Sequence, residues 1–157
     1  MRRNMDLFDQ FNKAILRLLQ RDGSLTQREI AEKVNLSANA CWNRIQALKR
    51  DGIILGQTTR LDRDKLGLGL VVFVMVRTRH HSIEWLTEFR RHVSSIPEVI
   101  DFYRIGGDYD YLLKVVAEDM AGYDAVYRRL ISGVELDSVT SYFAMEAIEE
   151  QRPFPID

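Results

Sequence analysis

Apolar side chains in the first third of the chain recur at helical spacing. Phe11, Ile15 and Leu18 lie three or four residues apart, and the run ends at Asp22-Gly23. Thr26 precedes a shorter apolar run and stands three residues before a glutamate, which is the sequence of a capping box. The pattern therefore predicts one helix up to residue 21 and a second, short helix from residue 27.

A third run begins after Ser37, whose hydroxyl can cap a helix, and ends at Asp51-Gly52. The spacing of its apolar residues predicts a buried stripe made of Ala38, Cys41, Ile45 and Leu48. Two short helices joined by a tight turn form a helix-turn-helix, in which the second helix enters the DNA major groove. Residues 53–61, which follow it, are predicted to form a strand.

From residue 68 onward the apolar pattern changes to that of strands. Continuous or alternating apolar residues predict strands at 68–78, 99–105, 111–117 and 138–148. Helices are expected between them, after the capping residues Ser82 and Asp119. The resulting order is βαββαβ, the ferredoxin-like arrangement in which two helices cover one face of an antiparallel sheet. The predicted fold class is therefore α+β, with a winged-type helix-turn-helix domain followed by a ferredoxin-like domain.

The charge distribution supports a division into two domains. Residues 1–65 carry 13 Lys and Arg against 8 Asp and Glu, a net charge of +5, whereas residues 66–157 carry 9 against 15, a net charge of −6. A basic half is suited to a polyanionic partner such as double-stranded DNA. We expect a DNA-binding domain at 1–60, a short charged linker at 61–67, and an oligomerisation and effector-binding domain at 68–157.

The composition excludes several classes of protein. The chain has 157 residues, of which 46% are hydrophobic and 29% are charged, and no apolar run is long enough to span a membrane. The N-terminus lacks the apolar stretch of a signal peptide, and the single cysteine fits a reducing compartment, so we expect a cytoplasmic protein. The spacing of the three histidines does not suggest a metal site, and no catalytic motif is present. We therefore expect no cofactor, no metal and no enzymatic activity.

The outer face of the predicted recognition helix carries side chains that can bind DNA. Asparagine and glutamine can bond adenine edges, arginine can bond guanine or phosphate, and alanine allows close approach. Hydroxyls at helix starts can bind phosphate oxygens. Any three-helix bundle has a polar outer face, so the pattern alone leaves a purely structural role open. The candidate DNA-binding residues are Thr26, Ser37, Asn39, Ala40, Asn43, Arg44, Gln46, Arg50 and Arg60.

The turn at residues 106–110 contains two glycines, two aspartates and a tyrosine. Glycines expose backbone amides that can bind a carboxylate, and aspartates can bind an ammonium group. Such a mixture suits a zwitterionic amino acid, although a Gly-Gly-Asp sequence also occurs in plain turns. The candidate effector-binding residues are Gly106, Gly107, Asp108, Tyr109, Asp110, Met120, Tyr123, Ser138, Thr140 and Tyr142.

Three other functions remain as alternatives to an effector-responsive regulator. An architectural DNA-binding protein would have no effector and weak sequence preference. A metabolic enzyme with an accessory DNA domain would need a catalytic constellation, which the sequence does not offer. A redox sensor would need an exposed thiolate, whereas Cys41 lies in the predicted buried stripe.

Several segments resemble the Lrp/AsnC (leucine-responsive, or feast/famine) family of transcriptional regulators. Residues 7–16 are similar to its opening "LDxxDxxIL", residues 36–45 to its recognition helix "LSxxxCxxRI", and residues 106–113 to its effector turn "SGxxDYLL". Residues 51–54 and 144–146 resemble its "DGxI" and its last strand. The resemblance covers nearly the whole chain in order.

The resemblance implies a homodimer formed through the βαββαβ domain, often assembled to an octamer, with amino acids bound between subunits at residues 106–111. The chain departs from the family at Asn39-Ala40, where a Thr-Pro pair is common, which puts the base preference in doubt. Residues 80–85, 123–124 and 143–146 look most like a subgroup that includes regulators of cysteine degradation. That resemblance implies a response to cysteine or to a branched-chain amino acid.

Overall fold

The structure, a computed structural model, describes residues 8–157. The chain forms two compact units: one contains the described residues up to Arg60 together with Glu149–Asp157, and the other is Leu61–Ile148. The sequence assigned all of 68–157 to the second domain, whereas the structure places the last nine residues with the first unit. Two features of the sequence analysis concern residues outside this range: the N-terminal segment, for which no signal peptide is expected, and Leu7 of the family-like segment.

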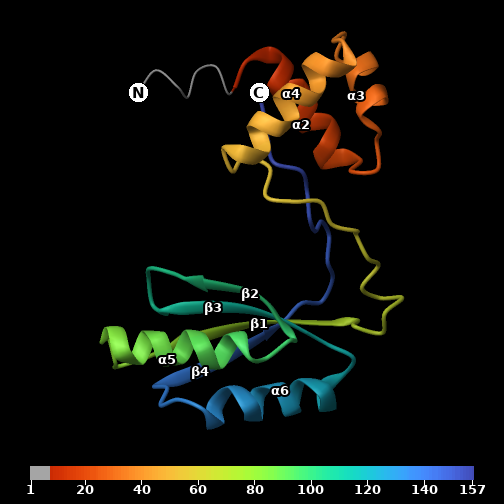
Figure 1. Ribbon diagram of the computed structural model, residues 1–157. Coiled ribbons are helices and arrows are strands. Elements are labelled where there is room, and N and C mark those ends of the chain that lie inside the picture. The colour runs from red at the N-terminus through yellow and green to blue at the C-terminus, as the bar shows by residue number, and fades with distance from the viewer. Residues whose placement is uncertain (1–7) are drawn as a thin grey trace. The chain divides into compact units, whose positions relative to one another are not determined.

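The described part of the first unit, here called the DNA-binding unit, contains the helices α2 (Gln10–Arg21), α3 (Gln27–Lys33) and α4 (Ala38–Arg50) (Figure 1). The predicted capping box is formed, because the Thr26 side chain accepts the Glu29 amide while the Glu29 carboxylate accepts the Thr26 amide. Helices α3 and α4 thus start where the sequence predicted, since the side chains of Thr26 and Ser37 each satisfy an otherwise unpaired amide.

The core of this unit lies where the three helices meet. Ile15, Cys41 and Leu48 are completely buried, which confirms most of the stripe expected on α4. Ala38 is the exception: it lies in the first turn of α4 and is exposed. The strand expected at 53–61 is also absent from the described structure, and this segment is extended without a strand partner. The first two residues of the segment instead donate their amides to the carbonyl of Leu48.

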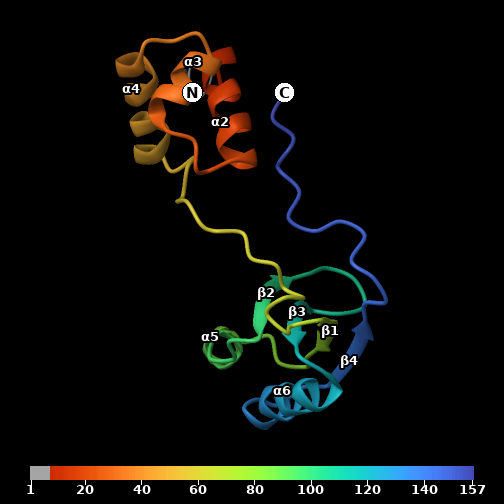
Figure 2. The same ribbon diagram turned by 90° about the vertical axis from the view of Figure 1, so that its right-hand side faces the viewer.

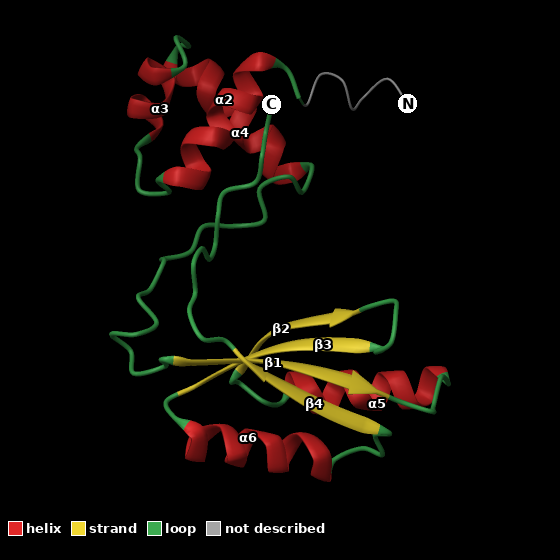
Figure 3. Cartoon of the chain, turned by 180° about the vertical axis from the view of Figure 1, so that it is seen from behind, coloured by secondary structure: helices red, strands yellow, loops and turns green. Residues whose placement is uncertain are grey.

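The second unit, here called the effector unit, is a four-stranded antiparallel sheet with the order β2-β3-β1-β4. This is the strand order of the ferredoxin-like fold, and it confirms the predicted βαββαβ topology. Figure 3 shows the strands side by side in this order, with the helices packed along them. The elements are β1 (Leu70–Arg77), α5 (Ile83–Ser94), β2 (Val99–Arg104), β3 (Tyr111–Ala117), α6 (Met120–Ser132) and β4 (Ser138–Phe143).

Both helices of the effector unit cover the same face of the sheet (Figure 2). Val72 and Val74 of β1 point into this layer, where they form one buried cluster with Phe89 of α5 and Leu130 of α6. Each of these side chains is at most 1% exposed. The alternation along β1 therefore decides which residues reach the core and which reach the other face.

The other face of the sheet, here called the open face, carries large apolar side chains. Phe73 of β1 lies opposite Lys114 on one side and Tyr142 on the other. Phe73 is 37% exposed, Tyr103 is 55% exposed and Tyr142 is 53% exposed. An antiparallel sheet that faces water on one side normally presents polar residues there, so aromatic exposure of this kind marks a contact surface.

The last strand is shorter than the sequence predicted, because β4 ends at Phe143 rather than at residue 148. Phe143 lies opposite Val72, close to the point at which β1 begins. Beyond it the chain makes one more bond, from the amide of Ala144 to Val71, and Met145 is then 98% exposed. The ladder between β4 and β1 thus ends two residues short of the start of β1.

The imidazole of His92 closes the C-terminal end of α6. Its Nε2 lies 2.9 Å from the carbonyl oxygen of Arg129 and 3.1 Å from that of Leu130. A Cβ added to Gly133 would stand only 2.0 Å from the imidazole ring, so the glycine makes room for it. His92 therefore serves to cap a helix, and within the described residues no cluster of His, Cys, Asp or Glu could hold a metal ion.

Substituting Gly133→Ala is expected to lower the free energy of unfolding by about 1–2 kcal/mol. The added Cβ would displace the His92 imidazole, and the carbonyls of Arg129 and Leu130 would then lose their hydrogen-bond partner. Thermal unfolding measures the change, with Gly69→Ala as control, since a Cβ there meets open space. Equal melting temperatures for the two variants would contradict this role of His92.

Candidate nucleic-acid interface and effector site

Helix α4 presents an exposed face to solvent along its length, from Asn39 near its start to Arg50 at its end. Asn39, Asn43 and Arg50 are exposed on it, and Ala40 and Gln46 are half-buried. Two amides, one guanidinium and a small side chain on one helical face form a surface that fits the edges of bases in a major groove. The structure thus brings these five sequence-predicted residues together.

The two hydroxyls predicted to bind phosphate are engaged in capping. Ser37 Oγ accepts the amide of Ala40 at 3.2 Å, and Thr26 Oγ1 donates to the Glu29 carboxylate at 2.7 Å. Hydrogen bonds from the Thr26 hydroxyl and amide hold the pKa of Glu29 below its ordinary value. Ser37 and Thr26 are both exposed. Either hydroxyl can therefore contact a phosphate while it continues to cap its helix.

Arg44 points toward α2 rather than outward. Its Nη1 donates to the Asp9 carboxylate at 2.6 Å and to the Asn12 side-chain oxygen at 3.1 Å, and its guanidinium lies 5.2 Å from the centre of the Phe11 ring. Partial burial raises the pKa of Asp9, but hydrogen bonds from the Asn12 amide and from Arg44 outweigh it and lower the pKa overall. Arg44 therefore fixes α4 against the start of α2, a role that local sequence spacing did not suggest.

Substituting Arg44→Ala is expected to destabilise the DNA-binding unit by about 1 kcal/mol, once solvent screening of this partly exposed pair is allowed for. Specific DNA binding should weaken because α4 loses its support. Thermal unfolding, followed by Trp42 fluorescence in a Trp85→Phe background, measures the first effect, and a DNA titration measures the second. Lost DNA affinity with unchanged stability would instead mean that Arg44 contacts DNA directly.

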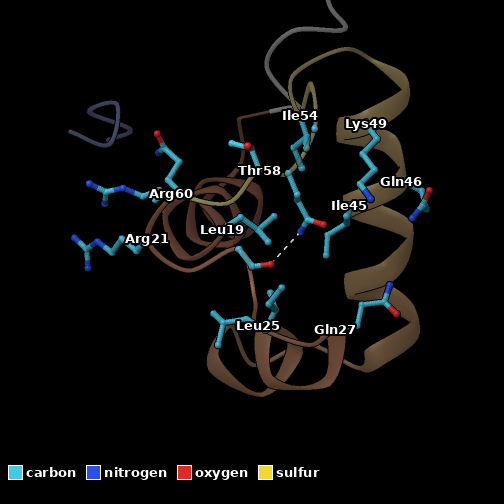
Figure 4. A pocket seen from close by; sticks show the side chains of 15 residues that line it. Leu19, Arg21, Leu25, Gln27, Ile45, Gln46, Lys49, Ile54, Thr58 and Arg60 are labelled. Atoms are coloured by element: carbon cyan, nitrogen blue, oxygen red, sulfur yellow. Dashed lines mark hydrogen bonds between the residues drawn. The ribbon is translucent and has the colours of Figure 1, made fainter. Parts of the chain in front are cut away.

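A pocket of about 500 Å³ lies in the DNA-binding unit beside the second half of α4. Figure 4 shows Leu19, Leu25, Ile45 and Ile54 forming its apolar wall, while Gln57 donates to the carbonyl of Gly23 at 3.3 Å and holds the extended segment in place. Polar and cationic side chains line the remainder, and they include two residues predicted to bind DNA. These side chains are Arg21, Gln27, Gln46, Lys49, Thr58 and Arg60.

Cys41 is completely buried at the centre of the α4 stripe. Burial raises the pKa of its thiol, and the nearby Arg44 offsets only part of that effect. A buried, protonated thiol is a poor nucleophile, so the structure does not favour the redox-sensor alternative.

In the effector unit, Arg77 organises the glycine-containing turn. Its Nε donates to the carbonyl oxygen of Asp108 at 2.8 Å, Nη2 donates to the same oxygen, and the guanidinium lies 5.4 Å from the centre of the Tyr109 ring. Gly107 has a φ of 129°, a conformation that side chains rarely adopt, so glycine is required there. Arg77 was not among the predicted residues; the only signal for it was a cation that ends an otherwise apolar strand.

Three of the predicted effector residues meet through hydroxyls on the open face. The Tyr109 hydroxyl lies 3.5 Å from Thr140 Oγ1. Hydrogen bonds with Thr140 and Tyr142 lower the pKa of Tyr109, and the shared bond with Tyr109 raises the pKa of Tyr142. Ser138 belongs to the same row of β4, opposite Arg77. The turn and β4 therefore form one polar corner of the open face, here called the turn site.

The two aspartates of the turn differ in their surroundings. The Asp110 carboxylate accepts the amide of Thr78 at 2.8 Å, and the Asp110 backbone bonds to Val76 and Ile105, so this residue closes the end of the sheet. The Asp108 side chain is exposed. Of the two predicted acceptors for an ammonium group, Asp108 is thus the one that faces solvent.

Two predicted effector residues lie away from the turn site within one chain. Tyr123 is 5% exposed and bonds to Ser141 on the helix-covered face, which is opposite to the face that carries Thr140. Met120 follows the end of β3 that pairs with Leu70, whereas the turn adjoins the other end of that strand. Met120 and Tyr123 therefore do not join Tyr109 and Thr140 in one subunit; alternation and strand direction separate them.

Comparison with known proteins shows to which family a chain with these two units belongs. Residues 71–154 match the model described as the Lrp/AsnC ligand binding domain, and residues 8–54 match a winged helix-turn-helix DNA-binding model. The chain belongs to the Lrp/AsnC family. Relatives include the DNA-binding transcriptional activator DecR of Escherichia coli K12, which is 44% identical over 152 residues, covering 96% of this chain and all of DecR. The glutamate uptake regulatory protein of Zymomonas mobilis is 46% identical over 148 residues, or 94% of this chain and 90% of that protein.

Solved structures of similar transcriptional regulators share the same fold. An AsnC family regulator from Agrobacterium tumefaciens has a TM-score of 0.91 and 47% identity, covering 94% of this chain and 96% of its own. The Neisseria meningitidis regulator NMB0573, solved as a complex with L-Met, has a TM-score of 0.89 and 29% identity, covering 95% and 97% of the two chains. These matches confirm the predicted fold class, a helix-turn-helix joined to a ferredoxin-like domain.

The Lrp/AsnC family assignment also settles the class of function. The chain is a DNA-binding transcriptional regulator with a ligand-binding domain, and it is not an enzyme. Among the described residues, none of the helices is long and apolar enough to cross a membrane.

Proposed function

We propose that this Lrp/AsnC protein is a cytoplasmic, sequence-specific regulator whose DNA binding responds to an amino acid held at the turn site. The observation that carries the proposal is the arrangement of Arg77, Asp108 and Tyr109, which builds a polar corner on a sheet face that exposes large aromatic side chains. The L-Met complex of the Neisseria meningitidis relative supports an amino acid as the ligand class.

Sequence-specific contacts are assigned to the outward face of α4. Asn39, Asn43 and Arg50 bind base edges or phosphates, and Ala40 allows the helix to lie close to the groove. Gln46 and Arg60, which line the pocket beside α4, reach the flanking backbone. Thr26 and Ser37 hold the starts of α3 and α4, and Arg44 holds the orientation of α4.

The turn site has a partner for each end of a zwitterionic amino acid. The exposed carboxylate of Asp108 pairs with the ligand ammonium, and the backbone amides of Gly106 and Gly107 bind the ligand carboxylate. Tyr109 and Tyr142 provide a wall for the ligand side chain. Residues 80–85, 123–124 and 143–146 resemble the subgroup that includes regulators of cysteine degradation, so cysteine and the branched-chain amino acids are the leading candidates.

The ligand binds between subunits, because one chain leaves the turn site open. The aromatic open face around Phe73 and Tyr103 pairs with the same face of a second chain to form a homodimer, and dimers associate further to an octamer. Met120 of a neighbouring subunit, which is 57% exposed, can then complete the ligand wall. The ligand shifts the equilibrium between assemblies by its differential affinity for them, and so changes the spacing of paired recognition helices.

Thermal unfolding against each of the twenty amino acids tests this proposal, with cysteine kept reduced. A ligand at a hundred times its dissociation constant stabilises a protein by about 2.7 kcal/mol, which raises the melting temperature by several degrees. We expect a selective rise with one or a few amino acids, abolished by Asp108→Asn and retained by the control Asp64→Asn, whose side chain is 74% exposed before β1. The absence of a rise with every amino acid would favour the architectural DNA-binding alternative.

A further inference from the structure

The last residues of the chain, 149–157 (the tail), bind to helix α2 of the DNA-binding unit. The side-chain amide of Gln20 donates to the carbonyl of Phe154 at 3.3 Å, and its oxygen accepts the Phe154 amide at 2.7 Å. Arg17 Nε donates to the carbonyl of Ile156 at 2.7 Å. These bonds join residues that are 134 and 139 positions apart, so neither helix nor tail could form them locally.

The chemistry of this contact is that of peptide recognition. A glutamine side chain offers one donor and one acceptor side by side, which is the same pair that an adjacent β-strand offers to a peptide. Phe154 lies between Pro153 and Pro155, whose fixed φ angles keep the segment extended before it binds. Prolines carry no amide hydrogen, so docking leaves no donor unpaired at either position.

The tail also adds apolar contact to a small core. Ile156 is half-buried and packs against the cluster of α2, α3 and α4, in which eight of the described residues are buried. Helical units of this size bury a small fraction of their surface and are marginally stable alone. Ile156 therefore supplies a meaningful share of the apolar burial available to the unit.

We propose that residues 153–157 are a docking peptide for the outer face of α2, and that their docking stabilises the DNA-binding unit. The occupant of this face is the tail of the same chain. Since the tail follows β4, the chain enters the DNA-binding unit a second time after completing the effector unit. The stability of the recognition helices thus depends on a segment encoded at the far end of the sequence.

Hydrogen exchange of the Phe154 amide in the full chain tests the docking itself. We expect exchange to become about tenfold faster in Gln20→Ala, because one hydrogen bond is lost, and to stay unchanged in Gln10→Ala. Gln10 is an exposed glutamine at the opposite end of the same helix, so it is a matched control. Exchange at the rate of an unstructured peptide in the unsubstituted chain would overturn the proposal.

Fluorescence of the two tryptophans tests the effect on stability. The chain has one tryptophan in each unit, Trp42 and Trp85, so a Trp85→Phe background reports on the DNA-binding unit alone. In that background Gln20→Ala and Ile156→Ala should each lower the melting temperature by several degrees, whereas Gln10→Ala should not. Melting temperatures that match the control would overturn the stabilising role.

A mixture of isotopically labelled and unlabelled chains identifies the occupant. Contacts between the Ile156 methyl groups and α2 should arise within one chain. Contacts only between labelled and unlabelled chains would assign the tail to a second copy and overturn the proposal as stated. None of these measurements uses an amino acid or DNA, so their outcome is independent of the proposed function.

Discussion

Substituting Ala40→Glu is expected to weaken specific DNA binding by about 100-fold, the largest single effect on α4. Ala40 lies on the outward face three residues after the cap Ser37, so a glutamate there places a carboxylate against the phosphates and base edges. The same position is the third residue of the helix, where a glutamate completes a capping box with Ser37. The helix should therefore remain folded, or become more stable, while its contact with DNA is lost.

Fluorescence anisotropy of a labelled duplex measures this loss, with circular dichroism as the check on folding. Ala125→Glu is the matched control, because it adds the same charge at an exposed position on α6 of the effector unit. If the two variants bound DNA equally well, α4 would not be the recognition helix.

Substituting Phe73→Asp is expected to raise the dissociation constant of the homodimer by more than about 100-fold. Phe73 lies on the open face between Lys114 and Tyr142, at the second strand from one edge of the sheet. Burial of this side chain against a second sheet contributes about 2 kcal/mol, and an unpaired buried carboxylate costs several more. Since Phe73 points away from the helices, the fold of one subunit should survive the change.

Analytical ultracentrifugation over a range of protein concentrations measures this shift. Ile83→Asp is the control, because Ile83 is 78% exposed at the start of α5 on the helix-covered side. A Phe73→Asp variant that remained dimeric would show that the open face is not the subunit interface.

The elements that the sequence predicted well are those decided by local chemistry. The capping residues Thr26, Ser37 and Ser82 fix where three helices begin, because each satisfies an amide of its own first turn. The near-continuous apolar run of residues 68–78 likewise predicted strand β1, although the structure was needed to show that Val72 and Val74 face the helices. Local signals of this kind are readable without knowledge of the rest of the chain.

Several features depended instead on partners far away in the sequence. Arg44 was assigned to DNA because its helical position is polar, but Asp9 and Asn12, more than thirty residues earlier, hold it. Tyr123 was grouped with Tyr109, although the pleat places its partner Ser141 on the opposite face of the sheet from Thr140. In both cases the residue type was a good candidate and its direction was not predictable from spacing.

The segments without a ladder partner were the least predictable. Residues 53–61 have the composition of a strand, yet no strand of the described chain pairs with them. The tail offers no periodic pattern at all, and only the fold reveals that Gln20 binds it. Backbone pairing is a property of two segments together, so one segment alone cannot specify it.

The most direct test of the central claim is the affinity of the full chain for a duplex that it has selected from a random-sequence pool. The affinity should be measured by anisotropy with and without each amino acid at millimolar concentration. An amino acid that binds the turn site should change the dissociation constant for DNA by about fivefold or more in the unsubstituted chain. The same amino acid should leave that dissociation constant unchanged in Asp108→Asn. A dissociation constant that no amino acid alters would contradict the account and leave a DNA-binding protein without this form of control.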